Sequence, residues 1–281
     1  MDLVSPVLPP ELERLIFEIY ALAHPRSIPK LMLVAQRVKQ WVEPLLYRTM
    51  VVESDQPLAG LPTYAANVVV SAIRDKPSSF FFVAVRNLCL FYWSTYDTQA
   101  ILAVCTGVEN LWLPGLENNR KLIPLLAALP IKQLYASCYR ILRTLPPTHR
   151  VFSRLTRLEL EDLLPVSVDC SFLAGAVSLL PRLTHLSFNY SGLILTCLRI
   201  LESCATLRVL VCLNPYVMRV YDLDELGLTR DVRFVVMHVR GYVEDWYTGT
   251  QSGEDYWSRA EVFIAKRRTE EIDPLRFEIP E

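Results

Sequence analysis

The amino-acid sequence predicts an α/β fold in which short parallel strands alternate with crossover helices and stack into a solenoid. The main observation is a pattern of apolar residues at positions one, four and six of a short segment, which recurs along the middle of the chain. Its clearest copies are RLTRLELEDL, which begins at Arg154, and RLTHLSF, which begins at Arg182. Self-similarity at a fixed period is typical of repeat proteins, so it takes precedence over assigning each element separately.

Seven segments carry this pattern, and their first positions are 85, 108, 131, 155, 183, 207 and 232. The spacing of 23 to 28 residues between them falls within the range of leucine-rich repeats. The central residues of the copies are Leu88, Leu111, Leu134, Leu158, Leu186, Leu210 and, least clearly, Val235. We therefore interpret 80–240 as a degenerate leucine-rich-repeat solenoid whose central residues are buried in successive parallel strands.

The segments between the copies are apolar on one side and long enough for two or three helical turns. We expect crossover helices over 98–105, 120–129, 172–180 and 193–204. The segment 139–152 contains Pro146 and Pro147, so no regular helix is expected there.

The flanking parts do not share the repeat period. A helical head is expected over 1–52, with one helix that begins near Pro10 and ends at His24-Pro25, followed by a second amphipathic stretch broken at Pro44.

The prolines and serines of 53–79 predict a linker. The segment 241–281 predicts a cap on the solenoid, in which a helix from about 255 to 268 buries one apolar face; a separate binding module is the alternative. The residues of that face are Trp257, Ala260, Phe263 and Ile264.

Composition argues against several classes of partner and site. The 29 basic and 30 acidic residues nearly cancel, so neither a nucleic-acid nor a membrane partner is expected. The basic run 266–268 is interpreted as the solvated last turn of a helix. The seven cysteines include no CxxC pair, which favours reduced core thiols over disulfides or a metal site, and no secretory signal is recognised. We expect a protein of the cytoplasm, the nucleus or both.

The sequence gives no indication of an enzyme. It contains no GxSxG or HExxH motif and no phosphate-binding glycine-rich loop. Its four histidines lie far apart, and His185, on the outward side of a predicted strand, is interpreted as a surface residue. No catalytic residue and no cofactor are expected.

The first fifty residues resemble the F-box. The residues that carry the resemblance are Leu8-Pro9, Glu11-Leu12, Ile16-Phe17, Leu31, Val34, Arg37, Lys39 and Trp41. An F-box followed by leucine-rich repeats is the layout of a class of ubiquitin-ligase substrate receptors, and the chain also resembles the F-box-like repeat proteins of fungi. The chain departs from the F-box pattern at the end of the third helix, 43–48, where the usual aromatic residues are replaced.

The resemblance implies that the head binds a SKP-type adaptor of a cullin-RING ubiquitin ligase, while the solenoid holds a protein substrate. The alternative is a non-degradative interaction scaffold. The candidates for adaptor contact, each of which could instead be an internal packing residue, are Leu8, Pro9, Leu12, Ile16, Phe17, Leu31, Val34 and Trp41.

The outward side of the predicted strands is the expected substrate surface, because side chains alternate along a strand. Trp112 and Tyr135 occupy the same outward position in neighbouring repeats and are expected to form one aromatic patch, a kind of surface that binding hot spots favour. The alternative is that the C-terminal cap or the segment 139–152 folds over them. The candidate substrate-binding residues are Phe91, Trp112, Tyr135, Arg157, Glu159, His185 and Asn189.

Overall fold

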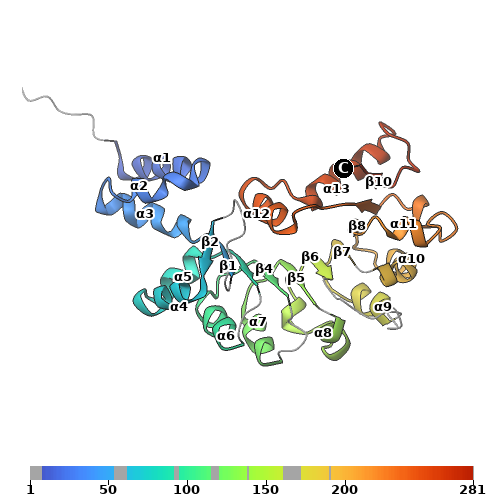
Figure 1. The fold of residues 1–281 in the computed structure, drawn as a ribbon, viewed down its shortest axis with the longest axis horizontal. Coiled ribbons are helices and arrows are strands. Elements are labelled where there is room, and N and C mark those ends of the chain that lie inside the picture. Colours follow the sequence, from blue (N-terminus) through green and yellow to red (C-terminus); the bar gives the residue numbers. More distant parts are fainter. Residues whose placement is uncertain are drawn as a thin grey trace, which may run out of the picture.

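The computed structural model describes residues 8–53, 62–91, 95–114, 120–137, 139–160, 172–189 and 191–280. It shows a leucine-rich-repeat solenoid with a small helical head at its N-terminal end (Figure 1). The strands form a curved row, with helices α4 to α10 on one side and helices α12 and α13 on the other. The fold class predicted from the sequence is confirmed.

All strands belong to one parallel sheet in the order β10-β9-β8-β7-β6-β5-β4-β3-β1-β2. The strands are β1 (Thr49–Glu53), β2 (Thr63–Ala65), β3 (Asn87–Leu90), β4 (Asn110–Leu113), β5 (Gln133–Ala136), β6 (Arg157–Leu160), β7 (His185–Phe188), β8 (Val209–Cys212), β9 (Phe234–Met237) and β10 (Glu278–Ile279).

The predicted register is confirmed for six repeats. Leu88 pairs with Leu111, and the row continues strand by strand through Leu134, Leu158, Leu186 and Leu210. All six leucines are buried. Each strand therefore presents its central leucine to the same side of the sheet, where the next strand's leucine packs against it.

The seventh copy was assigned one residue out of register. Leu210 pairs with Phe234, and Val211 pairs with Val235. Because neighbouring residues of a strand face opposite sides, this shift places Phe234 and Val236 in the core shared with the helices, while Val235 and Met237 face away from it. The four consecutive apolar residues FVVM, 234–237, show no alternation in the sequence, because both faces of this strand are buried.

The sheet begins earlier than the sequence predicted. Met50 pairs with Leu88 and Val52 with Leu90, so β1 is a further repeat strand inside the segment assigned to the head. Of the predicted linker, 54–61 lie outside the described residues, and 63–79 form β2, helix α4 and the start of α5. Pro62 and Pro77 directly precede β2 and α5, positions where a proline is compatible with the element that follows.

Helices return the chain from each strand to the next. The helices of the solenoid are α4 (Ala66–Asp75), α5 (Ser78–Ala84), α6 (Thr95–Val104), α7 (Ile123–Ala128, after the 3-10 turn η3, Arg120–Leu122), α8 (Tyr139–Thr144), α9 (Phe172–Ser178), α10 (Ile194–Ser203, after η5, Ser191–Leu193) and α11 (Val217–Val220), with η4 (Arg150–Phe152) and η6 (Leu228–Arg230).

The four crossover helices expected from the sequence correspond to α6, α7, α9 and α10. The expectation that 139–152 has no regular helix is wrong, since α8 occupies its first six residues. Pro146 and Pro147 follow the end of that helix, so they limit its length without preventing it.

The head consists of α1 (Pro10–Ala23), the 3-10 turn η1 (Pro25–Ser27), α2 (Ile28–Leu31) and α3 (Gln36–Leu46). It has a small core of its own, formed by Ala21, Ile28, Val38 and Val42. Pro44 lies in the last turn of α3 and does not break it.

The C-terminal segment forms α12 (Tyr242–Ser252) and α13 (Tyr256–Arg268) and ends in β10. Gly253, at a φ of 81°, ends α12 in a left-handed conformation that glycine adopts without steric cost. Asp255 then caps α13 in a capping box with Ser258. The predicted helix corresponds to α13, and the four residues of its predicted apolar face, Trp257, Ala260, Phe263 and Ile264, are all buried.

Candidate functional site

The strand surface, meaning the sheet face that points away from helices α4 to α10, is covered by α12 and α13. Apolar residues on this face and on the two helices form a second hydrophobic core. Its buried members are Val51, Cys89, Trp112, Tyr135, Val209, Val211, Leu213, Val235, Met237, Val239, Trp246, Tyr256, Trp257, Ala260, Phe263 and Ile264. The C-terminal segment therefore covers the strand surface, and not merely the end of the solenoid.

The aromatic patch predicted on the strand surface exists, but it is buried. Trp112 and Tyr135 stack with ring centroids 5.6 Å apart, and they are only 3% and 2% exposed. The Trp257 indole Nε1 donates a hydrogen bond to the Tyr135 hydroxyl at 3.0 Å, and the Trp246 Nε1 donates to Asn110 Oδ1 at 2.9 Å. Two tryptophans from the covering helices thus satisfy their polar groups on the strands while their rings pack on the patch.

Polar residues of the neighbouring strands also bind the covering helix. The Tyr256 hydroxyl donates to Glu159 Oε2 at 2.7 Å, and Arg157 lies 3.4 Å from Asp255 Oδ2. Burial raises the pKa of the Tyr135 and Tyr256 phenols well above the ordinary value, so both remain protonated at neutral pH. These groups have structural partners, and none is free to act as a catalytic base.

The expectation that the strand surface is open is therefore wrong. Glu159 and His185 are buried, as are Trp112 and Tyr135. Phe91, Arg157 and Asn189 are half-buried. The physical reason is the apolar character of the outward positions on β1, β3, β8 and β9, since a face this apolar is more stable when removed from water. The alternative weighed from the sequence, a C-terminal segment folded over the patch, is the arrangement found.

Arg267 corrects a second interpretation. The run 266–268 was expected to be solvated, and Lys266 and Arg268 are exposed, but Arg267 is only 1% exposed. Its guanidinium donates hydrogen bonds to the carbonyl oxygens of Thr229, Phe234 and Pro274 at 2.7 to 3.0 Å, and to that of Val232 at 3.1 Å. Burial lowers the pKa of this guanidinium from its ordinary value. Arg267 thereby connects the end of α13 to η6, β9 and the chain before β10.

The covering helix also makes stability sensitive to pH through His185. Its Nε2 lies 2.8 Å from Glu261 Oε1 on α13 and its Nδ1 lies 2.8 Å from Thr184 Oγ1. Burial, with Arg157 and Arg208 nearby, lowers the pKa of His185 below 6.5, although Glu261 opposes this shift. The unfolded chain therefore takes up a proton as the pH falls through about 6.5, while the folded protein does not until a lower pH.

We predict that the free energy of unfolding decreases as the pH falls below about 6.5, with a contribution from His185 of at most about 1.4 kcal/mol per pH unit. In His185→Gln this contribution is absent, so the loss between neutral and mildly acidic pH becomes smaller. Urea denaturation of both proteins at several pH values measures the difference. An identical pH dependence would contradict a lowered pKa for this imidazole.

The head presents the other candidate surface. Of the predicted adaptor contacts, Leu8, Pro9, Leu12, Ile16 and Val34 are exposed. Phe17, Leu31 and Trp41 pack against the head core instead, and the rings of Phe17 and Trp41 are 6.5 Å apart. The alternative of internal packing thus applies to three of the eight residues.

Four further apolar residues of the head are exposed and were not among the predicted adaptor contacts. They are Leu15, Ile19, Leu22 and Leu33. Leu12, Ile16 and Ile19 are four and three residues apart, a spacing that aligns side chains on one face of a helix. They are 49%, 54% and 58% exposed, so this face is not covered by the rest of the described chain. We call Leu12, Leu15, Ile16 and Ile19 the α1 apolar face. The spacing in the sequence places these residues on one face of a helix, but it does not distinguish a side that packs on α3 from a side that faces solvent.

Within the described ranges, no group of three or more His, Cys, Asp or Glu side chains is arranged to hold a metal ion. No helix in that part of the chain is long and apolar enough to cross a membrane.

No protein-family model matches the chain, and no curated protein matches it. Among solved structures, the chain is similar to the leucine-rich repeat-containing protein LegL7 from Legionella pneumophila. The identity is 16%, the match covers 68% of this chain and 74% of that chain, and the TM-score is 0.39. The assignment of the fold rests on the parallel sheet and its register.

Proposed function

We propose that this protein is a non-catalytic substrate-recognition subunit of the F-box type, whose head binds a SKP-type adaptor of a cullin-RING ubiquitin ligase. The body would hold a protein substrate, and the role places the protein in the cytoplasm, the nucleus or both. The observation that carries the proposal is the α1 apolar face, which is exposed on a head that has already formed its own core.

The α1 apolar face is unusual in this molecule because most large apolar side chains of the body are buried on one of the two sheet faces. Contiguous exposed apolar residues on a small helical unit are typical of a protein interaction site. The polar side of α1 is occupied by its own ion pairs, which link Arg14 to Glu18 at 2.8 Å and Glu13 to Arg37 of α3 at 2.7 Å. This division leaves the apolar side available to a partner while the head remains folded.

The second candidate is a non-degradative interaction scaffold, which the repeat fold also supports. Both candidates use the α1 apolar face, and they differ in the identity of its partner. Affinity purification of the tagged full chain followed by mass spectrometry tests this difference. Recovery of a SKP-type adaptor together with a cullin supports the ligase subunit, whereas a stable partner without either supports the scaffold.

We predict that Leu12→Ser together with Ile16→Ser lowers adaptor recovery at least about tenfold, because two apolar contacts are lost at the centre of the interface. The melting temperature should change by no more than a few degrees, because both side chains are exposed. The matched control is Leu179→Ser with Leu195→Ser, which removes two exposed leucines of the solenoid. Unchanged adaptor recovery with the head variant, or an equal loss with the control, would contradict the proposed docking surface.

A further inference from the structure

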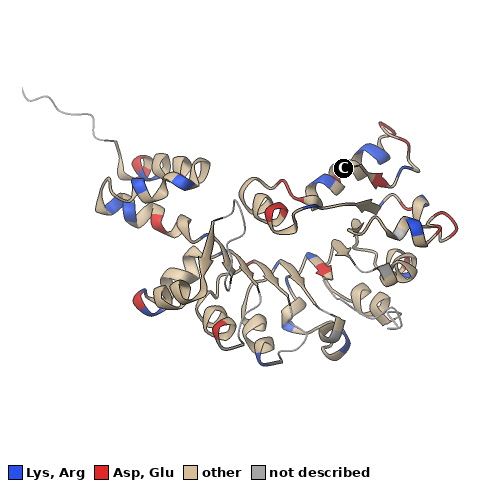
Figure 2. Ribbon diagram, in the orientation of Figure 1, with Lys and Arg blue, Asp and Glu red and all other residues tan. Residues whose placement is uncertain are grey.

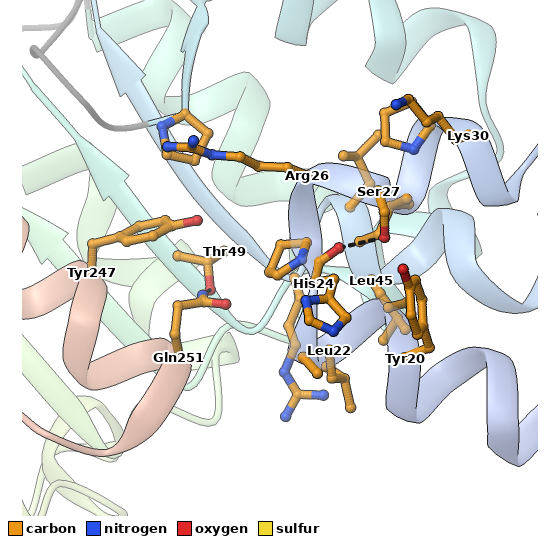
Figure 3. A pocket seen from close by; sticks show the side chains of 18 of the residues that line it. Tyr20, Leu22, His24, Arg26, Ser27, Lys30, Leu45, Thr49, Tyr247 and Gln251 are labelled. Atoms are coloured by element: carbon orange, nitrogen blue, oxygen red, sulfur yellow. Dashed lines mark hydrogen bonds between the residues drawn. The ribbon is translucent and has the colours of Figure 1, made fainter.

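A cleft separates the head from helix α12 (Figure 3). Its volume is about 1190 Å³, and its walls come from the end of α1, from η1 and α2, from the start of the sheet and from α12. On the side of the cleft away from the head, α12 is attached to β1 by a hydrogen bond from Gln251 Nε2 to Thr49 Oγ1 at 3.2 Å. The cleft therefore has walls from segments that lie far apart in the sequence.

Among the described residues that line this cleft, the charged side chains are all basic. Arg26, Lys30 and Arg48 line it together with His24, and none of these described lining residues is Asp or Glu. Within the described part of the chain, none of the three cationic side chains forms an ion pair or a side-chain hydrogen bond. By contrast, two other cations that contact the head are paired, since Arg37 lies 2.7 Å from Glu13 and Lys76 of the solenoid lies 2.8 Å from Glu43.

Like charges gathered in a concave region produce a stronger potential than the same charges on a convex surface, because the low-dielectric walls focus the field. An anion that enters the cleft gains attraction from three cations without displacing an existing ion pair. Figure 3 shows the Arg26 side chain extending from the head toward α12, above the ring of Tyr247. Burial raises the pKa of Tyr247, with Arg26 opposing the shift, so the phenol remains a hydrogen-bond donor for such an anion.

We propose that this basic cleft binds an anionic peptide segment of a partner protein, with Arg26, Lys30 and Arg48 pairing with its carboxylate or phosphate groups. Peptide binding is inferred from the charges and the shape of the cleft. Only the identification of the partner as a substrate of the ligase rests on the proposed function.

A peptide can match the apolar surface of the cleft as well as its positive charge. Tyr20 and Leu22 on the head are about half exposed, and they provide apolar surface beside the cations. Tyr64 of β2 also lines the cleft, and its hydroxyl donates to the Leu46 carbonyl at 2.9 Å. A segment with alternating acidic and apolar side chains could therefore cover both kinds of surface.

A nucleic acid fits less well, because its repeated phosphates need a continuous basic track. Figure 2 shows Lys and Arg interspersed with Asp and Glu over the described ribbon. The formal net charge is −1, so the molecule as a whole does not attract a polyanion.

The test uses the full chain and fluorescence anisotropy with short labelled peptides. One peptide is rich in glutamate, one carries phosphoserine at the same positions, and a neutral peptide carries glutamine there. We expect at least one anionic peptide to bind at least about tenfold more tightly than the neutral one, and to weaken as salt increases. The two anionic peptides distinguish carboxylate from phosphate as the recognised group.

Arg26→Gln with Arg48→Gln should weaken that binding about tenfold or more, because two of the three pairing cations are removed. The matched control is Arg143→Gln with Arg199→Gln, which lowers the net charge equally at exposed positions of α8 and α10. We expect the control to change the affinity less than about twofold. An equal loss in the control, or an equal affinity for the neutral peptide, would overturn the proposal.

A short single-stranded RNA that binds more tightly than both anionic peptides and depends on Arg26 and Arg48 would assign the cleft to nucleic acid and also overturn it. The Leu12→Ser, Ile16→Ser variant separates this inference from the proposed function. This variant should still bind the anionic peptide, because it leaves the cations of the cleft unchanged. Loss of adaptor binding and loss of peptide binding can therefore be observed separately.

Discussion

Replacing Arg267 with alanine is expected to lower the free energy of unfolding by about 3–5 kcal/mol, because several buried carbonyls lose their donor and each costs about 1–3 kcal/mol when left unpaired. The guanidinium is almost fully buried, and it donates to carbonyl oxygens of Thr229, Phe234 and Pro274. Alanine leaves these buried acceptors without donors, and hydrogen bonds from a charged group are the stronger ones. The end of α13 and β10 should then separate from β9 first.

Urea denaturation gives the free energy, and amide hydrogen exchange shows where the structure opens. Arg268→Ala is the matched control, because this neighbour is exposed and should change stability by less than about 0.5 kcal/mol. Arg267→Lys should remain strongly destabilised, since a single ammonium cannot donate to carbonyls arranged around a planar guanidinium. A loss of less than about 1 kcal/mol for Arg267→Ala would show that the carbonyls find other donors.

The repeat register could be predicted from the sequence because it depends on local patterning. Where a central leucine is flanked by polar residues, as Leu186 is by His185 and Ser187, the pattern indicates which side of the strand the leucine occupies. The same argument failed at β9, where Phe234 and Val235 are both apolar and both buried. When both faces of a strand are covered, hydrophobicity alone cannot choose between two registers.

The covering of the strand surface depends on contacts between residues far apart in the chain. Trp257 and Tyr135 are separated by 122 residues, and Trp246 and Asn110 by 136. No periodicity connects such pairs. One signal was nevertheless present in the sequence, since the outward positions of β8, Val209 and Val211, are apolar and would be unfavourable on an open face.

The head shows the same limit at a smaller scale. The helix that ends before His24-Pro25 is set by local chemistry, and α1 ends at Ala23 as predicted. The side of that helix that packs inward depends on α3, whose Val38 and Val42 form the head core with Ala21. The distinction between Phe17, which packs, and Ile16, which is exposed, follows only from that arrangement.

The largest loss of stability is expected when Trp112 and Tyr135 are both replaced by serine. On an open surface this change would cost little, but both rings are buried between the sheet and the helices α12 and α13. Truncating one buried large aromatic residue typically costs about 3–5 kcal/mol. The two rings touch, so their effects are not simply additive, and we expect a combined loss of at least about 5 kcal/mol.

The change also leaves the Trp257 indole without its acceptor on Tyr135 and removes the ring on which Trp246 packs. Hydrogen exchange should therefore increase first in α12 and α13, while the strands that pack on α6 and α7 remain protected longer. The matched control is Phe82→Ser with Tyr216→Ser, because these two aromatic residues are exposed and should change stability little. A double variant at Trp112 and Tyr135 that stays within about 1 kcal/mol of the unchanged protein would mean that α12 and α13 readily leave the strand surface. The aromatic pair would then be accessible to a partner, as the sequence pattern alone had indicated.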